Sequence, residues 1–98
     1  MTRPRVLIVD DDPQVRDLLH QIFLAGGYRC ALAGDGREGL ARFHALRPEL
    51  TVTDLRMPGV DGIELLVEIR RVDPDAAVLV LTGAPEIKTA IESLKLGA

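Results

Sequence analysis

Four short segments of the chain are apolar or β-branched at nearly every position. They are residues 6–9, 30–33, 50–53 and 77–81. A run that is apolar on every side chain is typical of a strand buried on both faces of a parallel sheet, because neither face meets water. The second run is the weakest of the four, and the third is rich in β-branched residues, which favour strands. The pattern therefore predicts four strands.

Apolar side chains recur at intervals of three and four residues after each run, which is the spacing of an amphipathic helix. The predicted apolar positions are Val15, Leu18, Leu19, Ile22 and Phe23 in the first helix, Leu40, Phe43 and Leu46 in the second, Ile63, Leu66 and Val67 with Ile69 as a further candidate in the third, and Ile87, Ala90, Ile91 and Leu94 in the last. Pro13 suits the first turn of the first helix, and Gly26-Gly27 ends it. Gly39 lowers the helix propensity of the second helix, and Pro48 ends it.

Strands and helices thus alternate along the whole chain. Such alternation requires right-handed crossovers between parallel strands, which place helices on both faces of an open sheet. The 98 residues are enough for one compact core and leave little room for a second unit. We therefore expect an α/β fold with a doubly wound parallel sheet, forming one domain over residues 1–98.

Polar residues follow three of the predicted strands. Asp10-Asp11-Asp12 come after the first strand, Asp54 after the third and Thr82 after the fourth. Ligands bind beyond the carboxyl ends of the strands in an open parallel sheet, so we expect these groups to converge on one rim. Carboxylates held close together repel one another unless a cation neutralises them, and Mg²⁺ prefers oxygen ligands. The sequence predicts a magnesium site at this rim.

The same rim indicates phosphoryl transfer. With a divalent cation to screen the incoming anion, the carboxylate of Asp54 is a suitable nucleophile toward a phosphoryl group. Thr82 is placed to donate a hydroxyl hydrogen bond to the bound group, and Gly83 beside it leaves an opening. Acids before Pro13 also suit a helix N-terminus, and we assign that role to Asp12, because capping needs one acid and not three.

The composition narrows the function classes. There are 12 Lys and Arg residues against 15 Asp and Glu residues, and the net charge of -3 has the wrong sign for binding nucleic-acid phosphates, so direct DNA binding is disfavoured. Cys30 has no second cysteine to pair with and is interpreted as a small hydrophobe in a reducing compartment. His20 and His44 are interpreted as surface residues. No apolar run approaches the roughly 20 residues of a membrane span, so we expect a cytoplasmic protein without a membrane segment.

Three motifs, taken in this order, resemble the receiver domain of two-component response regulators. They are Val9-Asp10-Asp11-Asp12-Pro13, Asp54-Leu55-Arg56-Met57-Pro58-Gly59-Val60-Asp61-Gly62 and Leu81-Thr82-Gly83-Ala84. The resemblance runs from Arg5 to Ala98. It implies an acidic metal-binding pair at Asp10 and Asp11, a phosphoacceptor at Asp54, a metal-ligating main-chain oxygen at Arg56 and a switch hydroxyl at Thr82.

The resemblance also implies a flavodoxin-like strand order of 2-1-3-4-5. It further implies that a sensor histidine kinase or a phosphotransfer protein donates the phosphoryl group. The chain would then be a regulatory phosphoacceptor domain, which assists its own phosphorylation and dephosphorylation, rather than an enzyme. In this reading the conformational change passes through Thr82 and the last helix.

One departure from the family changes these expectations. Family members continue past Gly97-Ala98 into a fifth strand, a lysine-proline pair that completes the site, and a fifth helix. We therefore expect the strand order 2-1-3-4 with the fifth strand missing. The strand over residues 77–81 would be an edge with unpaired backbone groups, so we predict self-association or domain swapping through it.

Two other functions stay open. The first is an interaction or dimerisation module, derived from a receiver domain, that has lost switching because part of the site is missing. The second is a hydrolase with an aspartyl-phosphate intermediate. The hydrolase ranks last, because Arg56 stands where such enzymes usually place a second acid.

Overall fold

The computed structural model describes residues 3–54 and 62–81. Their elements, in chain order, are β1 (Arg5–Val9), α1 (Pro13–Ala25), β2 (Arg29–Ala33), α2 (Gly36–Leu46), β3 (Leu50–Asp54), α3 (Gly62–Val72) and β4 (Ala77–Leu81). The four predicted strands and the first three predicted helices are therefore confirmed. The predicted last helix lies outside the described residues, as do Arg56 and Thr82.

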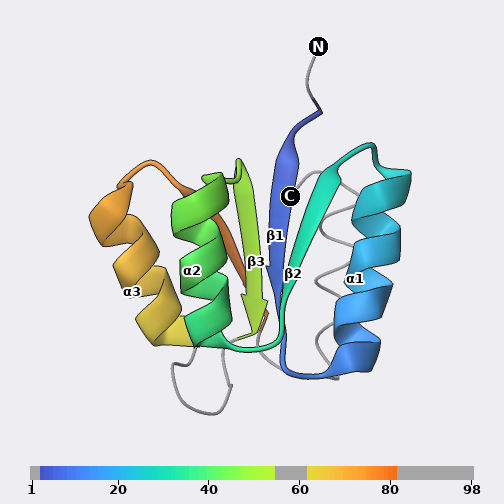
Figure 1. Ribbon diagram of the computed structural model, residues 1–98, viewed down its shortest axis with the longest axis horizontal. Coiled ribbons are helices and arrows are strands. Elements are labelled where there is room, and N and C mark those ends of the chain that lie inside the picture. Colours follow the sequence, from blue (N-terminus) through green and yellow to red (C-terminus); the bar gives the residue numbers. More distant parts are fainter. Residues whose placement is uncertain (1–2, 55–61, 82–98) are drawn as a thin grey trace.

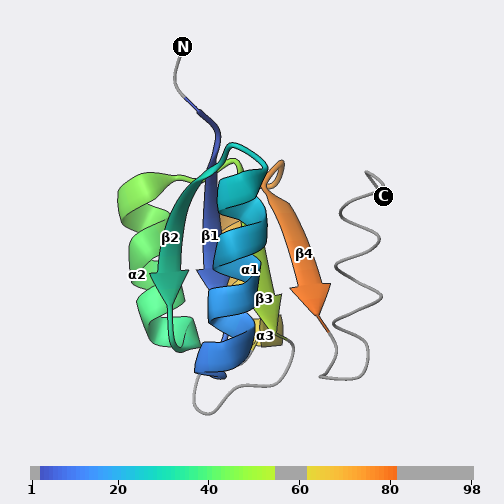
Figure 2. The same ribbon diagram turned by 90° about the vertical axis from the view of Figure 1, so that its right-hand side faces the viewer.

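The described strands form one parallel sheet in the order β2-β1-β3-β4, as expected for a flavodoxin-like fold. In register, Val9 of β1 pairs with Thr53 of β3, so the carboxyl ends of the two inner strands lie side by side. Helix α1 covers one face of the sheet, and α2 and α3 cover the other (Figures 1 and 2). The sheet is thus doubly wound, and the inner strands β1 and β3 have buried side chains on both faces.

Alternation along β1 divides the interior into two apolar clusters. Leu7 and Val9 point toward α2 and α3, whereas Val6 and Ile8 point toward α1. The first cluster contains Leu7, Val9, Ala33, Phe43, Leu65, Ile69 and Ala76. The second contains Val6, Ile8, Leu19, Phe23, Val52 and Leu81. The side chains of Val6, Leu7, Ile8 and Val9 are all buried, so burial on both faces of the sheet explains why this run is apolar at every position.

Side chains cap the first two helices at their N-termini. The carboxylate of Asp12 accepts a hydrogen bond from the backbone N–H of Gln14 at 2.9 Å, which confirms Asp12 as a capping residue. In α2, Asp35 accepts from the N–H of Glu38 at 2.8 Å, and the Glu38 carboxylate accepts from the N–H of Gly34 at 3.2 Å. These reciprocal bonds fix the loop between β2 and α2 beside the end of β1.

Gly39 lies where α2 packs directly against Val9 of β1. A Cβ atom at this position would lie 2.8 Å from Cγ2 of Val9 and 3.4 Å from Cδ2 of Leu65. The glycine therefore weakens the isolated helix but allows α2 to pack against β1 and α3. Its place in the sequence reflects packing rather than a turn.

The predicted apolar faces of two helices need correction. In α3, Ile63 and Val67 are 54% and 56% exposed, while Leu65 and Ile69 are completely buried. Apolar residues lie on more than one side of this helix, so their spacing alone does not show which side packs against the sheet. In α1, Leu18 is 45% exposed, and its neighbour Leu19 makes the core contact instead.

The described helices are α1, α2 and α3, and the longest of them, α1, has 13 residues. None of them combines the length and the apolar character that crossing a membrane would require.

Candidate functional site

Carboxylates from two distant segments meet at the carboxyl end of the sheet. Asp10 follows the last residue of β1, and Asp54 is the last residue of the neighbouring β3. Asp10, Asp11 and Asp54 each offer a carboxylate oxygen within 4.8 Å of those of the other two. The predicted convergence of these three acids on one rim is therefore confirmed, and it follows from parallel strands that end side by side.

The three acids differ in their access to solvent. Asp10 is only 1% exposed, Asp54 is half-buried, and Asp11 is exposed. An ion at this place would therefore meet one carboxylate fixed in the interior and two that face outward.

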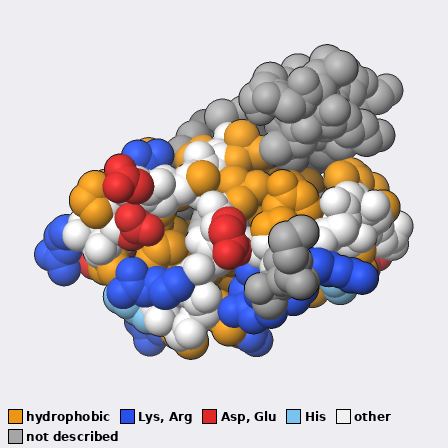
Figure 3. Space-filling view, turned by 90° about the horizontal axis from the view of Figure 1, so that it is seen from above, with side chains coloured by type: hydrophobic (Ala, Val, Ile, Leu, Met, Phe, Trp, Pro, Cys, Tyr) orange, Lys and Arg blue, Asp and Glu red, His pale blue; other side chains and the backbone are white. Residues whose placement is uncertain are grey.

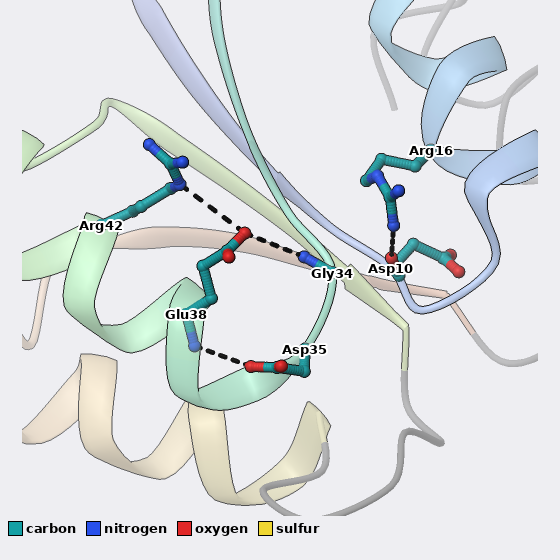
Figure 4. A network of polar contacts seen from close by, with 6 residues as sticks. All are labelled: Asp10, Arg16, Gly34, Asp35, Glu38 and Arg42. Atoms are coloured by element: carbon teal, nitrogen blue, oxygen red, sulfur yellow. Dashed lines mark hydrogen bonds and ion pairs between the residues drawn. The ribbon is translucent and has the colours of Figure 1, made fainter.

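The surroundings of Asp10 hold its carboxylate in one orientation. Oδ1 accepts a hydrogen bond from the N–H of Asp12 at 2.9 Å, while Oδ2 is buried and has no hydrogen-bond partner among the described residues. The backbone of Asp10 is held on both sides: its N–H donates to the carbonyl of Ala33 at 3.1 Å, and its carbonyl accepts from Nη1 of Arg16 at 2.7 Å (Figure 4).

Burial raises the pKa of Asp10 from 3.8 to about 6. This value is the net result of several effects: burial is the largest cause of the rise, the hydrogen bond from the Asp12 N–H lowers the pKa, and the negative charges of Asp54, Asp11 and Asp12 add to the rise. A carboxylate that is buried among other carboxylates is costly to ionise without a counter-charge. The site is therefore electrostatically prepared for a cation.

The residues at this site fit Mg²⁺. Three carboxylates supply hard oxygen donors, and Oδ2 of Asp10 is a buried acceptor that a cation would satisfy. Mg²⁺ usually takes one or two protein carboxylates and completes its coordination with water and phosphate oxygens, which suits the partly open position of Asp11 and Asp54. Arg56 and Thr82, the other two predicted site residues, lie outside the described residues.

The other end of the sheet has a different electrostatic character. Figure 3 looks onto this end, where side chains of both charges are interspersed. There the carboxylate of Glu49 accepts a hydrogen bond from the N–H of Arg5, which lowers the pKa of Glu49, and the nearby Arg29 and Arg5 charges lower it further. A raised carboxyl pKa is therefore a feature of the Asp10 end.

The family model of the response regulator receiver domain matches residues 6–98. The chain belongs to this family. As a receiver domain it is a regulatory domain of two-component signalling, whose general role is that of a phosphoacceptor. Members of the family bind Mg²⁺ at an acidic pocket and are phosphorylated by histidine kinases or phosphotransfer proteins. The predicted family is thus confirmed.

Individual relatives support the same assignment. The domain is 36% identical over 98 residues to sporulation initiation phosphotransferase F of Bacillus subtilis, covering all of this chain and 79% of that protein. It is 38% identical over 94 residues to the regulatory protein AtoC of Escherichia coli, covering 96% of this chain but only 20% of that protein. A solved structure of the response regulator TrrA from Thermotoga maritima, in complex with Mg(2+)-BeF, has a TM-score of 0.79 at 34% identity, covering 93% of this chain and 79% of that one.

Sequence reasoning did not identify the contact between Arg16 and Asp10. Arg16 and Asp17 are the two charged residues of the amphipathic helix α1, and a hydrogen bond from Arg16 to a main-chain carbonyl leaves no pattern in the sequence. The short interval between Asp10 and Arg16 was the available signal, because it places Arg16 in the first turn of α1, close to the end of β1.

Proposed function

We propose that this receiver domain is a phosphoryl-accepting switch of a two-component phosphorelay, with Asp54 as the acceptor. The observation that carries the proposal is the approach of carboxylate oxygens of Asp10, Asp11 and Asp54 to within 4.8 Å. The domain extends over residues 1–98, acts in the cytoplasm, and receives the phosphoryl group from a sensor histidine kinase or a phosphotransfer protein. Its net charge of -3 argues against direct binding of nucleic acid.

Asp10, Asp11 and Asp54 would hold Mg²⁺ together with the main-chain oxygen of Arg56. When bound, the ion would neutralise the carboxylates and screen the oxygens of the incoming phosphoryl group. The orphan Oδ2 of Asp10 supports this assignment. The relative TrrA is described in complex with Mg(2+)-BeF, which supports the same choice of metal.

Asp54 suits the role of nucleophile better than its two neighbours. Asp10 is buried, already accepts a hydrogen bond on Oδ1, and has a pKa raised to about 6. Asp11 is exposed and belongs to a loop, whereas Asp54 is half-buried and ends a central strand. A nucleophile must be both accessible and fixed in direction, and Asp54 meets both requirements.

In the proposed transfer, a carboxylate oxygen of Asp54 forms a bond to phosphorus while the bond between phosphorus and the donor histidine nitrogen breaks. The nitrogen leaves with the bonding electrons, and Asp54 carries a mixed anhydride. The hydroxyl of Thr82 then donates a hydrogen bond to the phosphoryl group, and the last helix carries the change to a partner. Regulation would be a shift between two populations of the domain.

Labelling with radioactive acetyl phosphate tests the acceptor. We expect the chain to be labelled in the presence of Mg²⁺ and not in EDTA, and Asp54→Asn to abolish labelling. Asp35→Asn is the matched control, because Asn also caps helices well and Asp35 lies in the β2–α2 loop, so its labelling should equal that of the wild type. Persistent labelling of Asp54→Asn refutes the assignment.

A non-switching interaction module is the second candidate. Strand β4 is one of the two outer strands of the described sheet, and its residues Val78, Leu79 and Val80 are half-buried rather than fully buried. Self-association or domain swapping through this strand would cover them. Sedimentation at micromolar concentration should then show a dimer whose fraction is the same with and without beryllofluoride as a phosphoryl mimic, whereas a compact monomer at every concentration contradicts self-association.

A further inference from the structure

Arg16 of α1 reaches back to the end of β1 and contacts Asp10 through its main chain. Its Nη1 donates to the carbonyl oxygen of Asp10 at 2.7 Å, and its side chain is half-buried. Figure 4 shows the guanidinium directed at this carbonyl, with the carboxylate of Asp10 turned away from it. The residue is therefore beside the acidic cluster but bonds to the one neutral oxygen of Asp10.

The same guanidinium also lies against the loop after β2. A Cβ atom on Gly34 would be 3.4 Å from Nη1 of Arg16, which is van der Waals contact distance, so the guanidinium lies directly beside Gly34. The preceding residue, Ala33, accepts the hydrogen bond from the N–H of Asp10 at 3.1 Å. The peptide groups on both sides of Asp10 are thus tied to neighbouring segments, one through β2 and the other through Arg16.

This choice of partner has a chemical consequence. An arginine next to carboxylates ordinarily forms charge-assisted, often bidentate bonds with them. Such a bond to Asp10 would occupy the oxygens that a cation needs. By bonding to the carbonyl, Arg16 fixes the direction of the Asp10 residue and leaves Oδ2 without a protein hydrogen bond among the described residues.

We propose that Arg16 is a positioning residue of the metal site, which orients Asp10 for Mg²⁺ through its hydrogen bond from α1 to the main-chain carbonyl of Asp10. The inference rests on the proposed function, because it assumes that Asp10 is a metal ligand. Arg16 itself touches neither the metal nor the phosphoryl group in this scheme.

The positive charge of Arg16 provides a way to test positioning against simple electrostatics. A cation beside the site repels Mg²⁺, so removal of this charge alone would tighten metal binding. Loss of an outer group that orients a metal ligand weakens metal binding by roughly tenfold to a hundredfold. The two effects have opposite signs, and the sign of the measured change identifies the role of Arg16.

The experiment measures the Mg²⁺ dissociation constant of the full chain by titration calorimetry for wild type, Arg16→Met and Arg5→Met. Methionine keeps an unbranched apolar stem and removes the donor. Arg5 is the matched control, because its Nη1 also donates to a main-chain carbonyl, that of Leu46 at 3.3 Å, but it stands at the other end of β1.

We expect Arg16→Met to raise the Mg²⁺ dissociation constant roughly tenfold and Arg5→Met to leave it within about twofold of the wild type. An unchanged or lower dissociation constant for Arg16→Met overturns the proposal, as does an equal loss of affinity in Arg5→Met. If Arg16→Met does not fold, Arg16→Gln, whose amide is too short to reach the carbonyl, replaces it with the same expectation.

Amide hydrogen exchange of the metal-free chain gives a second readout. The N–H of Asp12 donates to Oδ1 of Asp10, so its protection reports how firmly that carboxylate is held. Arg16→Met should reduce protection of the Asp12 amide relative to amides of α2, whereas unchanged protection overturns the proposal. Neither readout depends on phosphorylation, so failure of acetyl phosphate to label Asp54 refutes the proposed function separately.

Discussion

Asp10 and Asp54, which end neighbouring strands, present carboxylate oxygens within 4.8 Å of each other, and the charge of Asp54 helps to raise the pKa of Asp10. The pair is close because β1 and β3 are parallel and Val9 pairs with Thr53. Strand pairing therefore places two like charges together, although their repulsion opposes that arrangement. A metal ion relieves this repulsion, so metal binding and folding should be linked.

The raised pKa of Asp10 makes stability depend on pH. Its folded pKa of about 6 lies above its ordinary value of 3.8, so the folded state binds the proton more tightly than the unfolded state. The contribution of Asp10 to stability is full below pH 3.8 and is lost as pH rises through 6. In metal-free buffer at pH 7, Asp10→Asn should therefore be more stable than wild type by roughly 1 to 3 kcal/mol.

Urea denaturation at pH 4 and pH 7 in EDTA checks this expectation. The difference between Asp10→Asn and wild type should be much smaller at pH 4, where Asp10 is protonated in the folded state and about half protonated in the unfolded state. Asp75→Asn changes an exposed aspartate away from the cluster, and its difference in stability from wild type should be the same at pH 4 and at pH 7. A wild type that is more stable than Asp10→Asn at pH 7 without metal contradicts the prediction.

Mg²⁺ should stabilise the folded chain through the same acids. A ligand that binds only the folded state adds about 2.7 kcal/mol at a hundred times its dissociation constant. Thermal unfolding with and without saturating Mg²⁺ should show this gain for wild type and for Asp75→Asn, and EDTA should reverse it. Asp11→Asn and Asp54→Asn should lose most of the gain, because each removes one carboxylate of the cluster. An equal gain in all four chains would show that Mg²⁺ binds elsewhere.

Thr51 and Thr53 of β3 offer a matched pair of buried hydroxyls. Thr51 Oγ1 has no hydrogen-bond partner among the described residues, whereas Thr53 Oγ1 donates to the carbonyl of Asp54 at 3.1 Å. Thr51→Val removes an unsatisfied polar group and should raise the free energy of unfolding by about 1 kcal/mol. Thr53→Val removes a satisfied one and should lower it by about 1 kcal/mol. Urea denaturation measures both, and equal changes of the same sign would contradict the distinction.

Gly39 and Gly26 provide a second comparison. Alanine has the higher helix propensity by about 1 kcal/mol, but a Cβ on Gly39 would clash with Val9 at 2.8 Å. We expect Gly39→Ala to destabilise by roughly 1 to 3 kcal/mol. At Gly26 the nearest atom to a Cβ is at 3.5 Å and φ is -79°, so Gly26→Ala should change stability by less than about 0.5 kcal/mol. Thermal unfolding of the two variants checks the contrast, and a Gly39→Ala chain as stable as wild type contradicts it.

The sheet and the acidic cluster could be predicted because they follow from strong local signals and topology. Apolar runs marked the four strands, and the acids after the first and third strands had to meet once those strands were parallel neighbours. That the first and third strands are neighbours was predicted from the family resemblance, because the spacing of apolar residues does not determine the order of strands in a sheet. Prediction of Asp12 as a helix cap succeeded for a similar reason: a capping bond spans only two residues.

Features that depend on tertiary contact could not be predicted. The apolar positions of α3 include Ile63, Leu65 and Val67, and only packing against α2 and the sheet decides that Leu65 is buried. From the sequence, Gly39 was interpreted only as a residue that lowers helix propensity. Its packing against Val9 and Leu65 could not be predicted, because these residues are distant in the sequence. In both cases the structural role of the residue depends on contacts with another helix or strand.

Strands β1 and β3 are the inner strands of the described sheet, and each is hydrogen-bonded on both sides. Segments held in this way open last, and usually only when the whole domain unfolds. Asp10 and Asp54 are anchored at the ends of these two strands, so folding itself gathers the charges before any ion arrives. The pocket is thereby preorganised. The repulsion between its carboxylates is overcome when the chain folds, so a cation binds to ligands that are already in place.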